Sequence, residues 1–258
     1  MVGWLAGCHF ASAHTERLIL IIAWSKSTKM YPDAAQRAEE LLELQHSLSD
    51  KGALGERVKP DFQSYTITMT THAYSENPDK AHHTRRLLES LMEKVSAGDI
   101  EIVRNKAGPF SAVINAASKC ESCAPTSNAV KTDIADGFTS VFETSDNAYS
   151  IAEKTFQELR ADAFGIGVKP DHHCYGAFLR CIARHTTPGS SERDAKARMV
   201  FQEACEAGEV SRLVMDGLKE AAGKSVLAIP QLKAETLPRF WTRNVPRVFR
   251  YNPRRNRR

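Results

Sequence analysis

The sequence lacks the features that predict a membrane protein or a secreted, disulfide-linked protein. Its best apolar run, Leu18–Trp24, is far shorter than the roughly 20 residues needed to cross a bilayer, so no membrane partner is expected. The six cysteines are scattered over 258 residues, which does not indicate a disulfide framework. Residues 1–15 contain no Lys or Arg, which argues against a conventional signal peptide or an Arg-rich transit peptide.

Motifs of known catalytic chemistry are also missing. There is no Gly-rich phosphate loop, no His-Glu-x-x-His and no serine nucleophile elbow. Cys120-x-x-Cys123 has the spacing of half a zinc site, but no second pair with this spacing exists and a structural zinc needs about four ligands. The neighbouring pair His82-His83 is expected on an exposed helix face. We therefore expect no catalytic residue, no metal site and no cofactor, and a protein that is not an enzyme.

Acidic residues are absent from the segment 239–258, which contains eight arginines. Because the whole chain has a formal charge of +4, the residues before this segment have a charge of about −4. Trp241, Phe249 and Tyr251 lie among the arginines, a combination suited to phosphate contact and base stacking. Alternatives are a targeting segment, a solvated disordered end, or aromatic residues that cap the last helices.

What the sequence does contain is a repeat. The segment Val58–Asp61 recurs as Val168–Asp171, and a tyrosine follows each copy four residues later. Asp61 and Asp171 are predicted helix N-caps, because a carboxylate accepts hydrogen bonds from the first turn of a helix. The proline before each aspartate keeps the preceding chain out of the helix.

A second pattern occurs four times and predicts helices that pack closely. It consists of a small residue, then Leu or Phe four positions later, then Glu or Gln. The spacing puts the small and the large residue on one helical face, where the small one lets a neighbouring helix approach. The four copies are Ala38/Leu42/Glu43, Thr84/Leu88/Glu89, Ala152/Phe156/Gln157 and Ala197/Phe201/Gln202.

Together the two patterns predict four helical hairpins, and so an all-α fold of the α–α superhelix type. The first helices are expected at Glu16–Ser25, Gln63–Ser75, Pro109–Lys119 and His173–Arg184. The second helices are expected at Asp33–Ser49, Pro78–Val95, Asn147–Ala163 and Glu192–Ala207, followed by an unpaired helix at Val210–Ala222. A polar segment near 121–145 predicts an exposed loop. The repeat array then covers 1–223, and 224–258 is a basic tail.

Residues Thr15–Gly208 resemble the pentatricopeptide repeat family of organellar RNA-binding proteins, in the divergent form found in algae and other protists. The resemblance rests on an aromatic early in three first helices (Tyr65, Phe110 and Tyr175), on the small-residue pattern, and on the repeated Val-Lys-Pro-Asp. It implies a superhelix whose first helices line a groove for single-stranded RNA. The three aromatics themselves are expected in the core rather than against bases.

In this family two side chains of each unit contact one base: the residue after the early aromatic, and the last residue before the next unit. The corresponding positions are Thr66, Ser111 and Gly176 for the first, and Asp61, Lys106 and Asp171 for the second. Ser111 paired with Asp171 implies a purine, because a carboxylate accepts from ring and amino N–H groups. The residues expected to neutralise phosphates are Arg254, Arg255, Arg257 and Arg258.

The resemblance implies a non-enzymatic protein that binds single-stranded RNA in a mitochondrion or plastid and acts in RNA stability, processing or translation. Two alternatives stay open. One is a scaffold like the tetratricopeptide repeats, which binds a peptide in its groove. The other is a subunit of an organellar ribonucleoprotein, with other proteins as partners. Because Met1 falls almost inside the first hairpin, further hairpins upstream of it are one interpretation.

Overall fold

The computed structural model describes residues 21–28, 30–50, 59–102, 106–121 and 147–222. Within these ranges all regular secondary structure is helical and no strand is found, so the all-α prediction is confirmed. Residues 21–27 are helical and precede eight further helices. These are α2 (Ala34–Asp50), α3 (Phe62–Tyr74), α4 (Lys80–Ser96), α5 (Gly108–Lys119), α6 (Ala148–Arg160), α7 (His172–His185), α8 (Ser191–Ala207) and α9 (Arg212–Ala221). The predicted loop near 121–145 and the basic tail lie almost wholly outside the described residues.

The two repeated aspartates begin α3 and α7 as predicted. Asp61 accepts hydrogen bonds at Oδ1 from the backbone N–H and the hydroxyl of Ser64, both at 2.7 Å. Asp171 accepts from the backbone N–H groups of His173 at 3.0 Å and Cys174 at 2.9 Å. Both caps satisfy N–H groups that have no partner within the helix, and each is worth about 1 kcal/mol.

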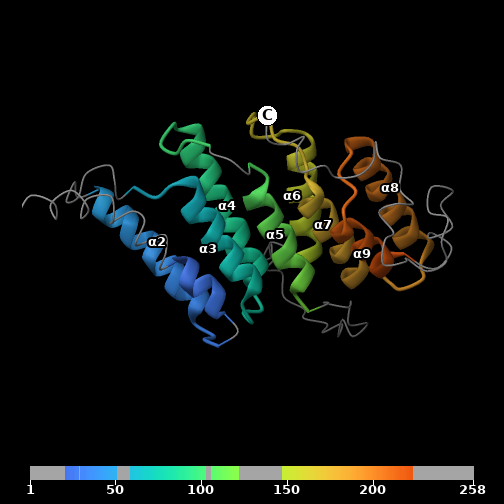
Figure 1. Ribbon diagram of the computed structural model, residues 1–258, viewed down its shortest axis with the longest axis horizontal. Coiled ribbons are helices and arrows are strands. Elements are labelled where there is room, and N and C mark those ends of the chain that lie inside the picture. Colours follow the sequence, from blue (N-terminus) through green and yellow to red (C-terminus); the bar gives the residue numbers. More distant parts are fainter. Residues whose placement is uncertain (1–20, 29, 51–58, 103–105, 122–146, 223–258) are drawn as a thin grey trace, which may run out of the picture.

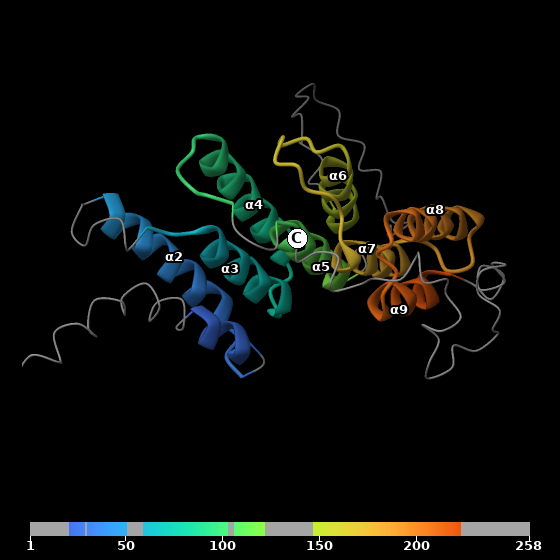
Figure 2. The same ribbon diagram turned by 45° about the horizontal axis from the view of Figure 1, so that its top comes forward.

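Helices adjacent in the chain pack against each other from α2 to α9, and α3, α5, α7 and α9 also pack in succession. Figures 1 and 2 show the helices following the chain order along the long axis of the molecule. One cluster of buried apolar side chains runs from Leu42 in α2 to Ala221 in α9. The hydrophobic core is therefore elongated and continuous, and every helix from α2 onward contributes to it.

The small-and-large pattern of the second helices accounts for much of this packing. All eight small and large residues of the pattern are buried, with Ala38, Thr84, Ala152 and Ala197 fully inaccessible. The early aromatics Tyr65, Phe110 and Tyr175 are at most 5% exposed, which confirms their place in the core. Burial of each large apolar side chain contributes about 1.5–3 kcal/mol. None of the described helices is long and apolar enough to cross a membrane.

Candidate functional site

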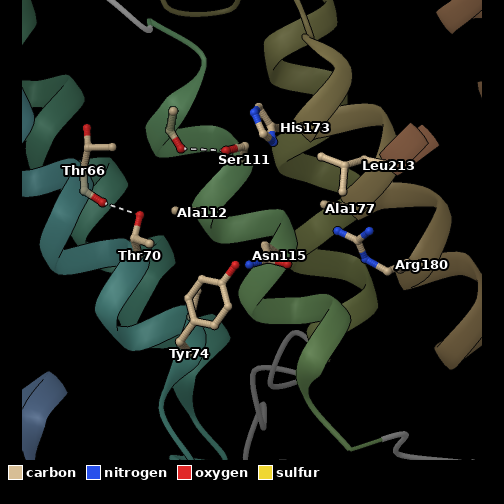
Figure 3. A pocket seen from close by; sticks show the side chains of 12 residues that line it. Thr66, Thr70, Tyr74, Ser111, Ala112, Asn115, His173, Ala177, Arg180 and Leu213 are labelled. Atoms are coloured by element: carbon tan, nitrogen blue, oxygen red, sulfur yellow. Dashed lines mark hydrogen bonds between the residues drawn. The ribbon is translucent and has the colours of Figure 1, made fainter. Parts of the chain in front are cut away.

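A polar pocket of about 450 Å³ lies across α3, α5 and α7 (Figure 3). The helices form it because α3 packs beside α5 and α5 beside α7, and Leu213 of α9 adds to the lining. None of the residues that line it is Asp or Glu. The pocket therefore offers hydrogen-bonding groups and positive charge, without a carboxylate to repel an anionic ligand.

The polar side chains of the pocket come from equivalent places on successive helices. α3 contributes Thr66 and Thr70, and α5 contributes Ser111 and Asn115, each pair separated by four residues. A separation of four residues places both members of a pair on one helical face. On α7 the matching positions are Gly176 and Arg180, of which Arg180 lines the pocket.

The hydroxyl groups of the pocket are oriented by their own helices. Thr66 Oγ1 donates to the carbonyl of Phe62 at 2.7 Å, and Ser111 Oγ donates to the carbonyl of Gly108 at 3.0 Å. Thr70 Oγ1 donates in the same way to the carbonyl of Thr66 at 2.7 Å (Figure 3). With the hydroxyl protons directed into the helices, the oxygens present lone pairs, so in this arrangement they accept hydrogen bonds from a ligand.

Asn115 and Arg180 supply donors where the hydroxyls supply acceptors. Figure 3 shows both side chains extending into the same space from α5 and α7. A primary amide can donate and accept, and a guanidinium has five N–H donors and a fixed positive charge. The two ends of the pocket are therefore chemically different, with acceptors over α3 and a cation over α7.

Tyr74 forms the floor of the pocket and is 54% exposed, although it is a large aromatic side chain. The ammonium group of Lys119 lies 3.1 Å from the centre of its ring, a cation–π contact. This ammonium group is buried and has no hydrogen-bond partner among the described residues. Burial, together with the positive charges of Arg180 and Lys80, lowers the pKa of Lys119 to about 8. Lys119 thus carries most of its charge at pH 7 and loses it just above.

His173 lies at the start of α7, on the rim of the pocket. Desolvation and then the electrostatic effect of the neighbouring His172 lower its pKa below the ordinary histidine value. The ring is consequently neutral at pH 7, where one nitrogen donates and the other accepts. It adds a hydrogen-bonding edge to the pocket without adding charge.

Of the positions implied by the family resemblance, Thr66 and Ser111 are brought together in the pocket. Asp61 and Asp171 do not line it, since their carboxylates cap α3 and α7. Lys106 is exposed just before α5 and is not part of the lining. The tail residues Arg254, Arg255, Arg257 and Arg258 lie outside the described residues.

Gly176 faces α9 and does not line the pocket. A Cβ atom at this position would lie 3.0 Å from the backbone of Leu213, so the absence of a side chain allows α9 to pack directly on α7. Gly217 on α9 has the matching role, because a Cβ there would lie 2.8 Å from the carbonyl oxygen of Gly176. The two glycines serve helix packing, and Arg180, one turn after Gly176, is the polar side chain that α7 contributes to the pocket.

Among the side chains that give the pocket its chemistry, sequence reasoning missed Thr70, Tyr74, Asn115 and Arg180. Three of them could have been found by adding four residues to each position that the resemblance supplied. The chain matches no known protein-family model, and no curated protein or solved structure matches it. The function of the pocket is therefore inferred from its own residues.

Proposed function

We propose that the helices form an α–α superhelix of helical hairpins, related to the pentatricopeptide repeats, and that the pocket across α3, α5 and α7 binds single-stranded RNA. The chain-ordered packing of the helices supports the superhelix, as does the close packing of α3, α5, α7 and α9 on one side. In this proposal the protein has no enzymatic activity. It is located in a mitochondrion or plastid, where it acts in RNA stability, processing or translation.

The observation that carries the RNA proposal is the row of polar groups at equivalent helical positions. Thr66 and Ser111 offer hydroxyl oxygens, which suit the N–H groups of an unpaired base edge. Tyr74 presents an exposed ring suited to base stacking, as in proteins that hold single strands without strong sequence preference. In the proposed complex these groups contact the bases of the RNA.

Positive charge supports the same proposal. Arg180 lies in the pocket, where a phosphate that follows a stacked base would meet its guanidinium, and the buried ammonium group of Lys119 beneath Tyr74 adds positive charge nearby. The arginine-rich tail, residues 239–258, would add further phosphate contacts. The pocket then sets the register of the strand, and the tail contributes affinity.

Binding of the full-length chain to a labelled, short single-stranded RNA, measured by fluorescence anisotropy, tests the proposal. Tyr74→Ala should weaken binding by about 1–3 kcal/mol if a base stacks on the ring. Arg180→Gln should weaken it and reduce the slope of log affinity against log salt by about 0.7, the contribution of one phosphate contact on a single strand. The matched control is Arg37→Gln, an exposed arginine on α2, which should bind as the wild type does.

Two further comparisons separate the pocket from the tail. Replacement of Arg254, Arg255, Arg257 and Arg258 together should reduce the salt slope by about three, since each phosphate contact contributes about 0.7 on a single strand. Wild-type affinity in both Tyr74→Ala and Arg180→Gln would refute the pocket, even if the tail variant lost affinity. No retention of RNA by the wild-type chain at low salt would refute the whole proposal.

The acidic charge of the chain before residue 239 favours a different function, a scaffold that binds a basic peptide or joins a ribonucleoprotein. Capture of a protein partner that survives nuclease treatment, with no bound RNA, would support that alternative. The pocket does not favour it, because none of its lining side chains is a carboxylate that could pair with a basic peptide.

A further inference from the structure

A second cluster of ligand-type side chains lies at α2, α3 and α4, away from the polar pocket. Glu39 of α2, His72 of α3 and His83 of α4 place one ligand atom each within 4.8 Å of the other two. Glu39 Oε2 lies 2.9 Å from His72 Nε2 and 3.8 Å from His83 Nδ1. Atoms bound at about 2.0–2.2 Å to one tetrahedral ion are roughly 3.3–3.6 Å apart, so small side-chain shifts would complete the geometry.

We propose that Glu39, His72 and His83 bind one divalent transition-metal ion, with Zn²⁺ as the best match. Two imidazoles and one carboxylate form a donor set typical of zinc, whereas Mg²⁺ and Ca²⁺ prefer sites made only of oxygen. This inference goes beyond the RNA proposal and does not depend on it. It also differs from the sequence-based expectation of no metal site.

His72 is buried, and its closest partner is the Glu39 carboxylate of the same cluster. This side chain is 2% exposed, and neither of its ring nitrogens makes an aligned hydrogen bond within the described part of the chain. Buried polar atoms are nearly always hydrogen-bonded, because leaving one unsatisfied costs about 1–3 kcal/mol. A metal ion bound to both Nε2 and Glu39 Oε2 would replace this misaligned ion pair at 2.9 Å with two metal–ligand bonds.

The surroundings of Glu39 favour one free ligand oxygen. Arg86 donates from Nη2 to Oε1, which leaves Oε2 as the oxygen that faces both histidines. A hydrogen-bonded ligand carboxylate is the usual arrangement around protein metal sites. The positive charge of Arg86 opposes any divalent cation, so the metal–ligand bonds must outweigh this repulsion.

The two imidazole ligands come from neighbouring helices. His83 Nδ1 also lies 3.4 Å from Arg86 Nη2, so an ion would take the place of this contact. The two rings are stacked, with centres 5.2 Å apart and planes at 6°.

A water molecule can reach the proposed ion. A pocket of about 370 Å³ opens beside His83 and is lined by that residue with Asp79, His82 and Arg86. Three protein ligands plus water would complete a four-coordinate ion. The site would hold α2, α3 and α4 together at the edge of the molecule where α2 packs.

Titration of the full-length protein with Zn²⁺ by calorimetry, after treatment with a chelator, tests the proposal. We expect one ion per chain and no comparable heat with Mg²⁺. Co²⁺ should bind in the same place and give the visible absorption of a four-coordinate ion. Thermal unfolding should shift upward with Zn²⁺, because an ion that binds only the folded chain stabilises it.

His83→Asn and Glu39→Gln should each lower Zn²⁺ affinity at least about tenfold, since even the loss of a residue that hydrogen-bonds to a metal ligand costs that much. The matched control is His82→Asn, the adjacent exposed histidine, which should keep the affinity within about twofold. Circular dichroism checks that the variants fold, and His83, which is partly exposed, is the safest position to change. Absence of Zn²⁺ binding, unchanged affinity in His83→Asn, or an equal loss in His82→Asn would overturn the assignment.

Discussion

Arg193 offers a direct measurement of what holds the last helix in place. Its side chain is 8% exposed and crosses from α8 to the end of α9. Nε donates to the carbonyl of Ala221 at 2.7 Å, and Nη2 donates to the carbonyl of Glu220. Carbonyls in the last turn of a helix have no partner within it, and a cation there also meets the negative end of the helix dipole.

We expect Arg193→Met to destabilise the protein by about 2–4 kcal/mol. Two charge-assisted hydrogen bonds are worth about 1.5–3 kcal/mol each, and hydrogen bonds from water to the freed carbonyls recover part of this free energy. Methionine keeps most of the apolar stem, so the loss reports the hydrogen bonds rather than a cavity. Because total stabilities are about 5–15 kcal/mol, the effect is large enough to measure by urea unfolding.

The control for this prediction is Arg212→Met on α9, whose side chain is 83% exposed and pairs with Asp216 in the same helix. A substitution of that kind usually changes stability by less than about 0.5 kcal/mol. If Arg193→Met cost no more than Arg212→Met, the buried guanidinium would not anchor α9. Hydrogen exchange should locate the loss of protection in α9 rather than throughout the chain.

Two further predictions concern the packing and the pH dependence of the pocket. Gly217→Ala should destabilise by about 1–3 kcal/mol in urea unfolding, because the added methyl would lie 2.8 Å from the Gly176 carbonyl; unchanged stability would mean that α9 does not pack this closely on α7. RNA affinity should fall between pH 7 and pH 9, because Lys119 has a lowered pKa of about 8 and loses its positive charge in this range. The variant Lys119→Met should bind RNA with an affinity that no longer depends on pH in this range. An equally steep pH profile in Lys119→Met would exclude Lys119 as the titrating group.

The helices were predictable because their signals are local. Asp61 and Asp171 are followed directly by the turns that they cap, and the small residues at positions such as Ala152 lie four residues from their large neighbours. These relations depend on backbone geometry within a few residues, which the sequence displays. The ends of α3 and α7 accordingly fall within one residue of those expected.

The pocket was only half predictable, because part of it depends on how closely helices approach. Thr66 and Ser111 followed from their place after the early aromatics, and both line the pocket. Gly176 occupies the same place on α7, yet α9 covers it at a contact distance that leaves no room for a side chain. The environment of Lys119, under the ring of Tyr74, also arises only when α3 and α5 pack together.

The Glu39–His72–His83 cluster was missed for a related reason. Each residue comes from a different helix, and no short motif joins them. His82 and His83 are neighbours in sequence but lie about 100° apart around α4, so one is exposed while the other turns toward α2 and α3. A doublet of histidines on a helix therefore has two different environments, and only the packing decides which ring meets a carboxylate.

The two proposed sites share α3, and the geometry of that helix keeps them apart. Thr70 and His72 are separated by two residues, which places their side chains about 160° apart around the helix axis. Thr70 faces the polar pocket with α5, whereas His72 faces α2 and α4. An ion between Glu39, His72 and His83 would consequently contact only the side of α3 that is turned away from the polar pocket. Any effect of Zn²⁺ on RNA affinity would have to come from the position of α3 itself, and linkage requires RNA to change Zn²⁺ affinity by the same factor.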